Sequence, residues 1–169
     1  MSFDLYLEHF ESGESAPVDR DKILAILLRE HCQKDRYGFH LAEFSDGTHV
    51  SMTMPNLEDG EEGEDGGKDF TGCAFHLRGF SPMIINFIFS VAEAGDMVIF
   101  NFQGKNTVDD PVLIALNPQQ LPHLPKLTTN GTEAYIPVLC TSPEQLWTLL
   151  GMGFEEWTDY RDQVIGRQP

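Results

Sequence analysis

Apolar and polar residues alternate from the start of the chain, and this predicts a strand with one buried face. Phe3, Leu5 and Leu7 fall on one side of it, whereas Asp4 and Glu8 fall on the other. Such alternation is typical of a half-buried strand, because successive side chains point to opposite faces of a sheet. The first strand is therefore expected to present its carboxylates to solvent.

The spacing of apolar residues changes to that of a helix from Asp19 to about Lys34, and Asp19 can cap the first turn. A hairpin is predicted next, with strands over residues 39–44 and 49–54. Asp46-Gly47 between them is a strong type I′ turn signal, because both central residues of that turn need positive φ. These elements form a first unit, residues 1–55.

The order strand, helix, strand, strand recurs in a second unit, residues 70–117. Its first strand spans residues 70–78, and its helix begins with Ser81 as the cap and Pro82 in the first position. The helix is expected to end at Gly95, before strands over residues 97–103 and 112–116. The two units share the order of their elements and no residue-level identity.

These patterns predict an α+β fold in one domain, with a mostly antiparallel sheet of about six strands and both helices on one face. Residues 118–169 are expected to add a long connection and a C-terminal helical segment. An edge strand is predicted over residues 133–139, where Pro137 interrupts the pattern. Ser142 caps a helix that Gly151 and Gly153 should end, before a last helix over residues 154–164.

The charge balance narrows the class of partner. Among 169 residues, 11 are Lys or Arg and 27 are Asp or Glu, which gives a net charge of −16. This charge argues against binding to nucleic acid or to an anionic membrane, because phosphate contacts need Lys and Arg. It favours a basic protein partner. We see no secretion signal and no apolar stretch long enough to cross a bilayer, so a cytoplasmic protein is expected.

Motifs that carry chemistry are scarce in the sequence. Cys32, Cys73 and Cys140 are widely spaced and suit neither a disulfide framework nor a metal knuckle, so buried, reduced thiols are expected. The sequence has no phosphate-binding loop, nucleophile elbow or paired-histidine motif. No cofactor and no resident metal are therefore expected, and a binding protein is favoured over an enzyme.

An acidic, glycine-rich segment, EDGEEGEDGGKD, dominates the connection of residues 56–69 and is the first candidate site. Its carboxylates can occupy the basic cleft of a protein partner. The alternatives are weak Ca²⁺ binding, although the spacing matches no EF-hand loop, and a loop that is only solvated. The residues expected to contact the partner are Glu58, Asp59, Glu61, Glu62, Glu64 and Asp65.

The polar face of the predicted sheet is the second candidate site. Two carboxylates, two imidazoles and a guanidinium on one surface can bind a metal ion or a polar ligand, as in a small-ligand or metal-dependent enzyme. The simpler alternative is the solvated side of an antiparallel sheet. Strand parity places on this face Asp4, Glu8, His49, His76 and Arg78, with Asn101 from a further strand.

The opening SFDLYLEHFESGE resembles the start of small immunity proteins from bacterial polymorphic-toxin and contact-dependent growth inhibition systems. The resemblance implies a protein that binds and blocks a cognate toxin, often a basic nuclease, through acidic side chains.

The repeated order of elements is loosely similar to that of vicinal oxygen chelate proteins, which build a metal site from paired modules, but each half here is a strand short. A third hypothesis is an assembly subunit with Trp147, Trp157 and Tyr160 at an interface.

Overall fold

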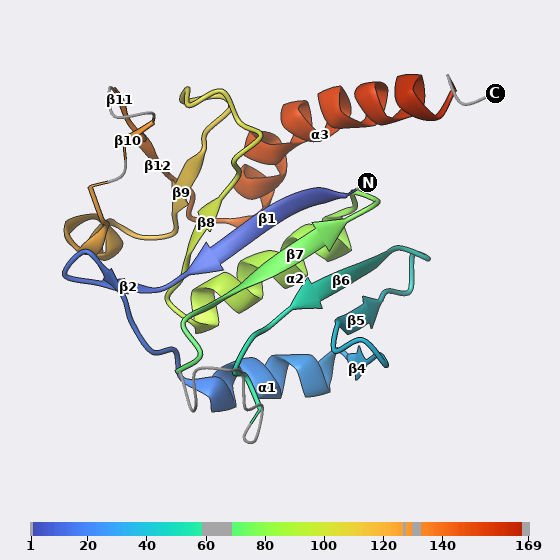
Figure 1. Ribbon diagram of the computed structural model, residues 1–169, viewed down its shortest axis with the longest axis horizontal. Helices are drawn as coiled ribbons and strands as arrows, with labels where there is room; N and C mark the ends of the chain where they lie inside the picture. The colour runs from blue at the N-terminus through green and yellow to red at the C-terminus, as the bar shows by residue number, and fades with distance from the viewer. Residues whose placement is uncertain (1, 59–68, 127, 130–132, 167–169) are drawn as a thin grey trace.

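The computed structural model describes residues 2–58, 69–126, 128–129 and 133–166 (Figure 1). Within these residues the fold is α+β, with helices packed on one face of a mostly antiparallel sheet, as predicted. The helices are α1 (Arg20–Arg29), α2 (Pro82–Ala94), α3 (Pro143–Ile165) and the short 3₁₀ helix η1 (Pro118–His123).

The strands form one large sheet and two small hairpins. The large sheet contains β1 (Phe3–Glu8), β4 (Gln33–Lys34), β5 (His40–Glu43), β6 (His49–Thr53), β7 (Gly72–Leu77), β8 (Val98–Phe100), β9 (Leu113–Ala115) and β12 (Pro137–Leu139), in the order β12-β9-β8-β1-β7-β6-β5-β4. The hairpins are β2 (Phe10–Glu11) with β3 (Glu14–Ser15), and β10 (Thr128–Thr129) with β11 (Glu133–Ala134).

The two predicted units interleave in the large sheet. β1 of the first unit pairs with β7 of the second along their whole length, from Phe3↔Leu77 to Glu8↔Gly72. β6 pairs with the other side of β7, and β8 with the other side of β1, so the central order is β8-β1-β7-β6. With α1 following β1 and α2 following β7, this is the split β-α-β arrangement of ferredoxin-like folds.

The sheet has eight strands rather than about six, because each edge carries an additional short strand. β4 comes from residues that the sequence pattern assigned to the first helix, which instead ends at Arg29. His31 adopts a left-handed backbone with φ of 54°, and the N–H of Cys32 donates to the carbonyl of Leu27. This Schellman motif ends the helix and directs the following residues into the sheet beside β5.

The structure joins the two predicted C-terminal helices into one, because α3 runs through Gly151 and Gly153. The predicted break was wrong, since packing of a continuous apolar face outweighs the cost of about 1 kcal/mol that each glycine carries in a helix. Leu146, Leu150, Gly153 and Trp157 are buried and recur at helical spacing along that face.

The predicted edge strand is present in part. β12 begins at Pro137 and pairs in parallel with β9 at the edge of the sheet. A proline is tolerated there because one side of an edge strand has no neighbour to which it must donate.

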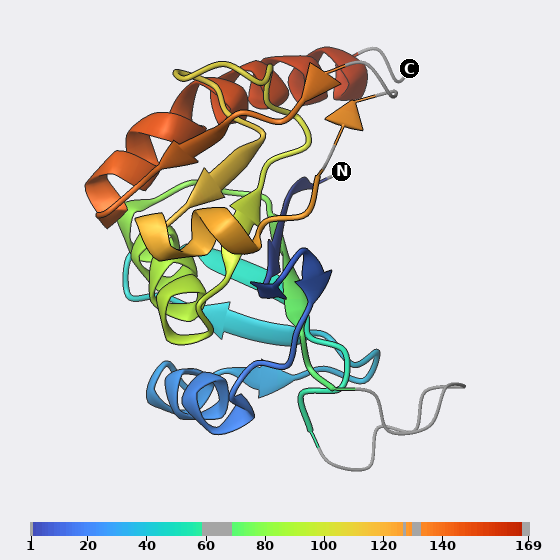
Figure 2. The same ribbon diagram turned by 90° about the vertical axis from the view of Figure 1, so that its left-hand side faces the viewer.

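The main hydrophobic core lies between the large sheet and the helices, and Figure 2 shows α1 and α2 together on one side of the sheet. Phe3, Leu5 and Leu7 of β1 point into this core and are at most 1% exposed. The residues of α1, α2 and α3 that face the sheet belong to the same cluster. The alternation in the first strand therefore predicted its buried face correctly.

Two of the three aromatic residues considered for an assembly interface pack within the chain. Trp157 is buried, and Trp147 stacks on Phe80 with 4.3 Å between ring centroids. Tyr160 alone of the three points largely to solvent, at 59% exposed.

The other face of the sheet is divided into a covered and an open part. Over β8 and β9 it is covered: Phe10, Leu124 and Tyr135 pack there against Val98, Phe100, Leu113 and Ala115. Over β1, β7, β6 and β5 alternate residues remain accessible. We call this second part the open sheet face. Asn101, which strand parity placed on the polar face, is instead buried beneath α3, because β8 ends at Phe100 and the chain turns.

Leu5 and Tyr6 are neighbours on β1 that point to opposite faces, so they test this assignment. We expect Leu5→Ala to lower the free energy of unfolding by about 2–5 kcal/mol, because it leaves a cavity in the core. Tyr6→Ala should lower it by about 1 kcal/mol, since Tyr6 is 42% exposed and loses mainly its contact with Phe102. Urea unfolding of both variants measures the difference, and equal losses would contradict the assignment of faces.

Candidate functional site

A hollow of about 620 Å³ lies on the open sheet face, where β1, β7, β6 and β5 meet the turn between β4 and β5. Pairing in the sheet brings its floor together, because His76 lies directly opposite Asp4 on one side and Ser51 on the other. The hollow is lined by Ser2, Asp4, Asp35, Tyr37, Phe39, Leu41, His49, Ser51, His76 and Arg78.

The turn of residues 35–39 forms one wall of the hollow and is held by its own first residue. The Asp35 carboxylate accepts hydrogen bonds from the backbone N–H groups of Tyr37 (2.8 Å) and Phe39 (3.0 Å). Gly38 provides the left-handed backbone that the turn needs, with φ of 87°. The turn leaves the Tyr37 ring 70% exposed, with the Arg36 guanidinium 4.6 Å above it.

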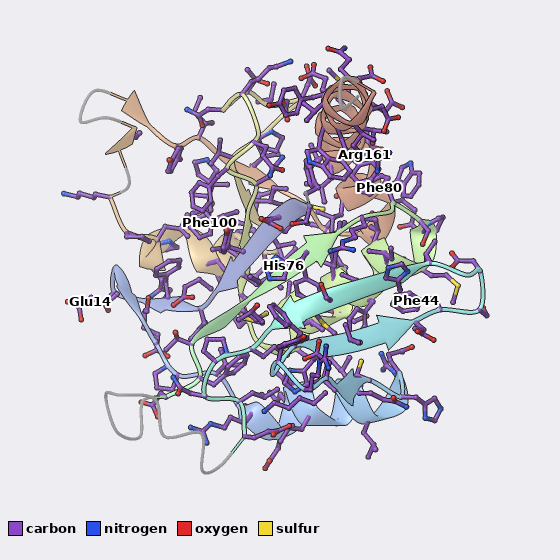
Figure 3. All side chains as sticks on the ribbon, turned by 45° about the vertical axis from the view of Figure 1, so that its right-hand side comes forward. Glu14, Phe44, His76, Phe80, Phe100 and Arg161 are labelled. Carbon is purple, nitrogen blue, oxygen red and sulfur yellow. The ribbon has the colours of Figure 1, made fainter. Side chains whose placement is uncertain are left out.

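A chain of hydrogen bonds crosses three strands of the open sheet face, with His76 at its centre. Figure 3 marks His76 on the sheet. Asp4 Oδ1 lies 2.9 Å from His76 Nδ1, and Thr53 Oγ1 lies 2.9 Å from His76 Nε2. Ser2 donates to the same oxygen of Asp4 at 2.7 Å. Since the carboxylate can only accept, a neutral His76 carries its proton on Nδ1, and its Nε2 accepts from the Thr53 hydroxyl.

Four of the five residues predicted for the polar face line this one hollow: Asp4, His49, His76 and Arg78. Glu8 lies four residues along β1 from Asp4, about 13 Å away at the rise of an extended strand, and stands opposite Gly72. Glu8 is therefore on the same face and outside the hollow. Arg78 has no acidic partner within the part of the chain that the structure describes.

The sequence pattern did not predict the wall of the hollow. Tyr37 and Phe39 belong to a turn between two short strands, and the spacing of apolar residues predicted a helix over one of those strands. The sequence does contain one indication of this turn, because Asp35 and Gly38 are residue types that favour tight turns.

Most of the acidic segment lies outside the described residues. Asp59, Glu61, Glu62, Glu64 and Asp65 are in this undescribed part, so their predicted role stays a prediction.

Glu58 is the one described member of the expected set. Its carboxylate accepts from Lys34 Nζ at 3.2 Å and lies 3.4 Å from His40 Nε2. The hydrogen bond from Lys34, and to a lesser extent the one from His40, lowers the pKa of Glu58. The negative charge of Glu58 is therefore partly neutralised by Lys34 of the same chain.

The cysteines are poorly suited to nucleophilic catalysis. Burial raises the pKa of the Cys32 thiol to about 11, and it also raises the pKa of Cys73 and Cys140. At neutral pH all three are protonated thiols, which are weak nucleophiles.

The described residues contain no group of three or more His, Cys, Asp or Glu side chains that could hold a metal ion. The same residues include no helix of the length and apolar character needed to cross a membrane. No protein-family model matches the chain, and no curated protein matches it.

The tautomer of His76 tests the hydrogen-bond chain directly. We expect ¹⁵N NMR of the imidazole at pH 8 to show the proton on Nδ1, which is the less common tautomer of a free histidine. Asp4→Ala removes the acceptor and should shift the proton toward Nε2, whereas Glu8→Ala should leave the spectrum of His76 unchanged. A proton on Nε2 in the unmodified protein would contradict the arrangement.

Proposed function

We propose that the protein is a binding module that engages a basic protein partner through its open sheet face. The observation that supports this function best is the hollow itself, where exposed aromatic rings stand beside carboxylates on a face that no helix of the described residues covers. Aromatic side chains at the centre of a polar surface are the residues that most often anchor protein interfaces.

The rings and carboxylates of the hollow offer complementary contacts to a cationic side chain, although Arg78 lines the same hollow. Tyr37 is 70% exposed and Phe39 is 38% exposed, so both rings can pack against an arginine or lysine. Asp4 and Asp35 supply carboxylates beside them. The Arg36 guanidinium already stacks on Tyr37, which illustrates the kind of contact that this ring makes.

The net charge of −16 also supports a basic partner, because complementary charge attracts the partner over a long range and speeds association. A toxin with a basic active-site cleft, such as a nuclease, is the class of partner that the resemblance to immunity proteins implies. The acidic segment of residues 58–69 is proposed to add to the same attraction, with Asp59, Glu61, Glu62, Glu64 and Asp65 as further contacts.

A fluorescein-labelled peptide of alternating arginine and glycine tests this proposal by fluorescence anisotropy. We expect the peptide to bind, and its affinity to fall as ionic strength rises from about 50 to 300 mM. Tyr37→Ala and Asp4→Asn should together weaken binding by about tenfold, equivalent to about 1.4 kcal/mol, because a ring and a carboxylate are lost from the hollow.

The matched control is the pair Tyr160→Ala and Asp159→Asn on the exposed side of α3, which removes the same ring and the same charge elsewhere. This control should change the affinity by less than about twofold. If both double variants weaken binding equally, attraction is a property of the total charge and the hollow is not the site.

One observation favours a second candidate function, hydrolysis at Thr53. Asp4, His76 and Thr53 form a carboxylate–imidazole–hydroxyl chain with 2.9 Å at each step. In this geometry His76 Nε2 can take the hydroxyl proton while Thr53 Oγ1 attacks an electrophilic carbonyl or phosphorus, and Asp4 stabilises the imidazolium that forms.

A fluorophosphonate probe tests this second function, because attack by Thr53 forms an O–P bond, releases fluoride and passes the proton to His76. The second function predicts a mass increase of one adduct, located on Thr53 by peptide mapping. His76→Ala should abolish the labelling, whereas Thr48→Ala, which removes a hydroxyl bonded to Asp46 and Ser81, should not. Absence of any adduct on Thr53 would reject the second candidate.

A further inference from the structure

A buried polar site lies beneath α3, away from the open sheet face. Asn101 is 0% exposed and Asp110 is 3% exposed. Asn101 Nδ2 and Asp110 Oδ1 have no hydrogen-bond partner among the described residues, and they do not bond to each other. A buried polar atom without a partner costs about 1–3 kcal/mol, so two such atoms beside the same residue of α3 favour a ligand that satisfies both.

The other polar atoms of these two side chains are engaged, and this fixes their orientation. Asn101 Oδ1 accepts from the N–H of Gln103 at 3.3 Å, and Nδ2 lies on the side of α3. Asp110 Oδ2 accepts from the N–H of Lys105 at 3.2 Å, which leaves Oδ1 free. The site therefore presents one hydrogen-bond donor and one acceptor.

Gly153 of α3 lies next to both of these atoms. A Cβ atom at this position would lie 3.6 Å from Asp110 Oδ1 and 3.7 Å from Asn101 Nδ2, with Phe3 Cζ at 3.7 Å as the third neighbour. Both polar atoms thus border the side of α3 that the glycine leaves without a side chain.

We propose that one buried water molecule binds beneath Gly153 and bridges Asn101 to Asp110. Water is the ligand because it can accept from Nδ2 and donate to Oδ1 at once, which a monovalent cation beside the amide N–H cannot do. The water joins the two ends of the loop between β8 and β9 beneath the middle of α3. The exposed ion pair between Lys105 and Glu156, 2.6 Å long, links the same loop to α3.

Alanine and serine substitutions at Gly153 test the proposal, with Gly151 as the control. A Cβ at Gly151 meets nothing within 4 Å, so its substitutions report helix propensity alone, and Gly151→Ala should melt higher than Gly151→Ser. At Gly153 the order should reverse. The alanine methyl displaces the water and leaves both polar atoms unpaired, which should lower Tm by about 4–10 °C. The serine hydroxyl can replace the water and should restore most of the loss.

Gly153→Ala is the decisive variant. A Cβ at this position would contact its neighbours at 3.6–3.7 Å, which are ordinary packing distances, so the alanine itself fits without a clash. Without a water at the site, Gly153→Ala should stabilise α3 as Gly151→Ala does, and that result overturns the proposal. A crystal structure of the unmodified protein at a resolution that shows ordered water gives a second readout. Density within hydrogen-bond distance of both Asn101 Nδ2 and Asp110 Oδ1 supports the site, and its absence rejects it.

Discussion

The antiparallel pairing of β1 with β7 is the constraint on which the rest of the structure depends. It joins the first residues of the chain to the start of the second unit, and every other strand of the large sheet is placed outward from this pair. The register decides the faces as well. Phe3, Leu5 and Leu7 turn toward the helices, so the residues between them must turn outward. A shift of one residue would bury Asp4 and Glu8, whose charges would then lack partners.

The same register assembles the site. Asp4 and His76 are far apart in the sequence, and they bond because Asp4 stands directly opposite His76 in the β1–β7 pair. The β6–β7 pair sets Ser51 opposite His76 and Ala74 opposite Thr53. The small Ala74 side chain leaves room for the imidazole to reach Thr53. The hydrogen-bond chain is thus a direct product of strand pairing and needs no special loop.

Much of this arrangement could be predicted from the sequence, and the parts that could not have specific physical reasons. Period-two alternation correctly predicted which residues of β1, β6 and β7 share the polar face, because parity is a local property. It could not predict that Glu8 lies outside the hollow, since the position along the sheet depends on strand order. The end of α1 was missed because a non-glycine residue, His31, takes the left-handed conformation.

Burial by distant segments accounts for the other differences between the prediction and the structure. Asn101 looked like a surface residue because it follows a strand with suitable parity, yet α3 covers it. The same helix passes through two glycines because its buried face continues across them. Both outcomes depend on how the last segment of the chain packs, and local propensity does not contain that information.

The protein thus keeps polar side chains in two physically different settings. On the open sheet face Asp4, His76 and Thr53 form hydrogen bonds to one another beside solvent, so water can replace a partner that is lost. Beneath α3, Asn101 and Asp110 are cut off from solvent, so the loss of a hydrogen-bond partner there lowers the stability of the folded state. Changes on the open face should therefore have little effect on stability, while changes beneath α3 act on stability first. This separation suits the proposed function, in which the sheet is the binding surface and the helices hold the sheet in register.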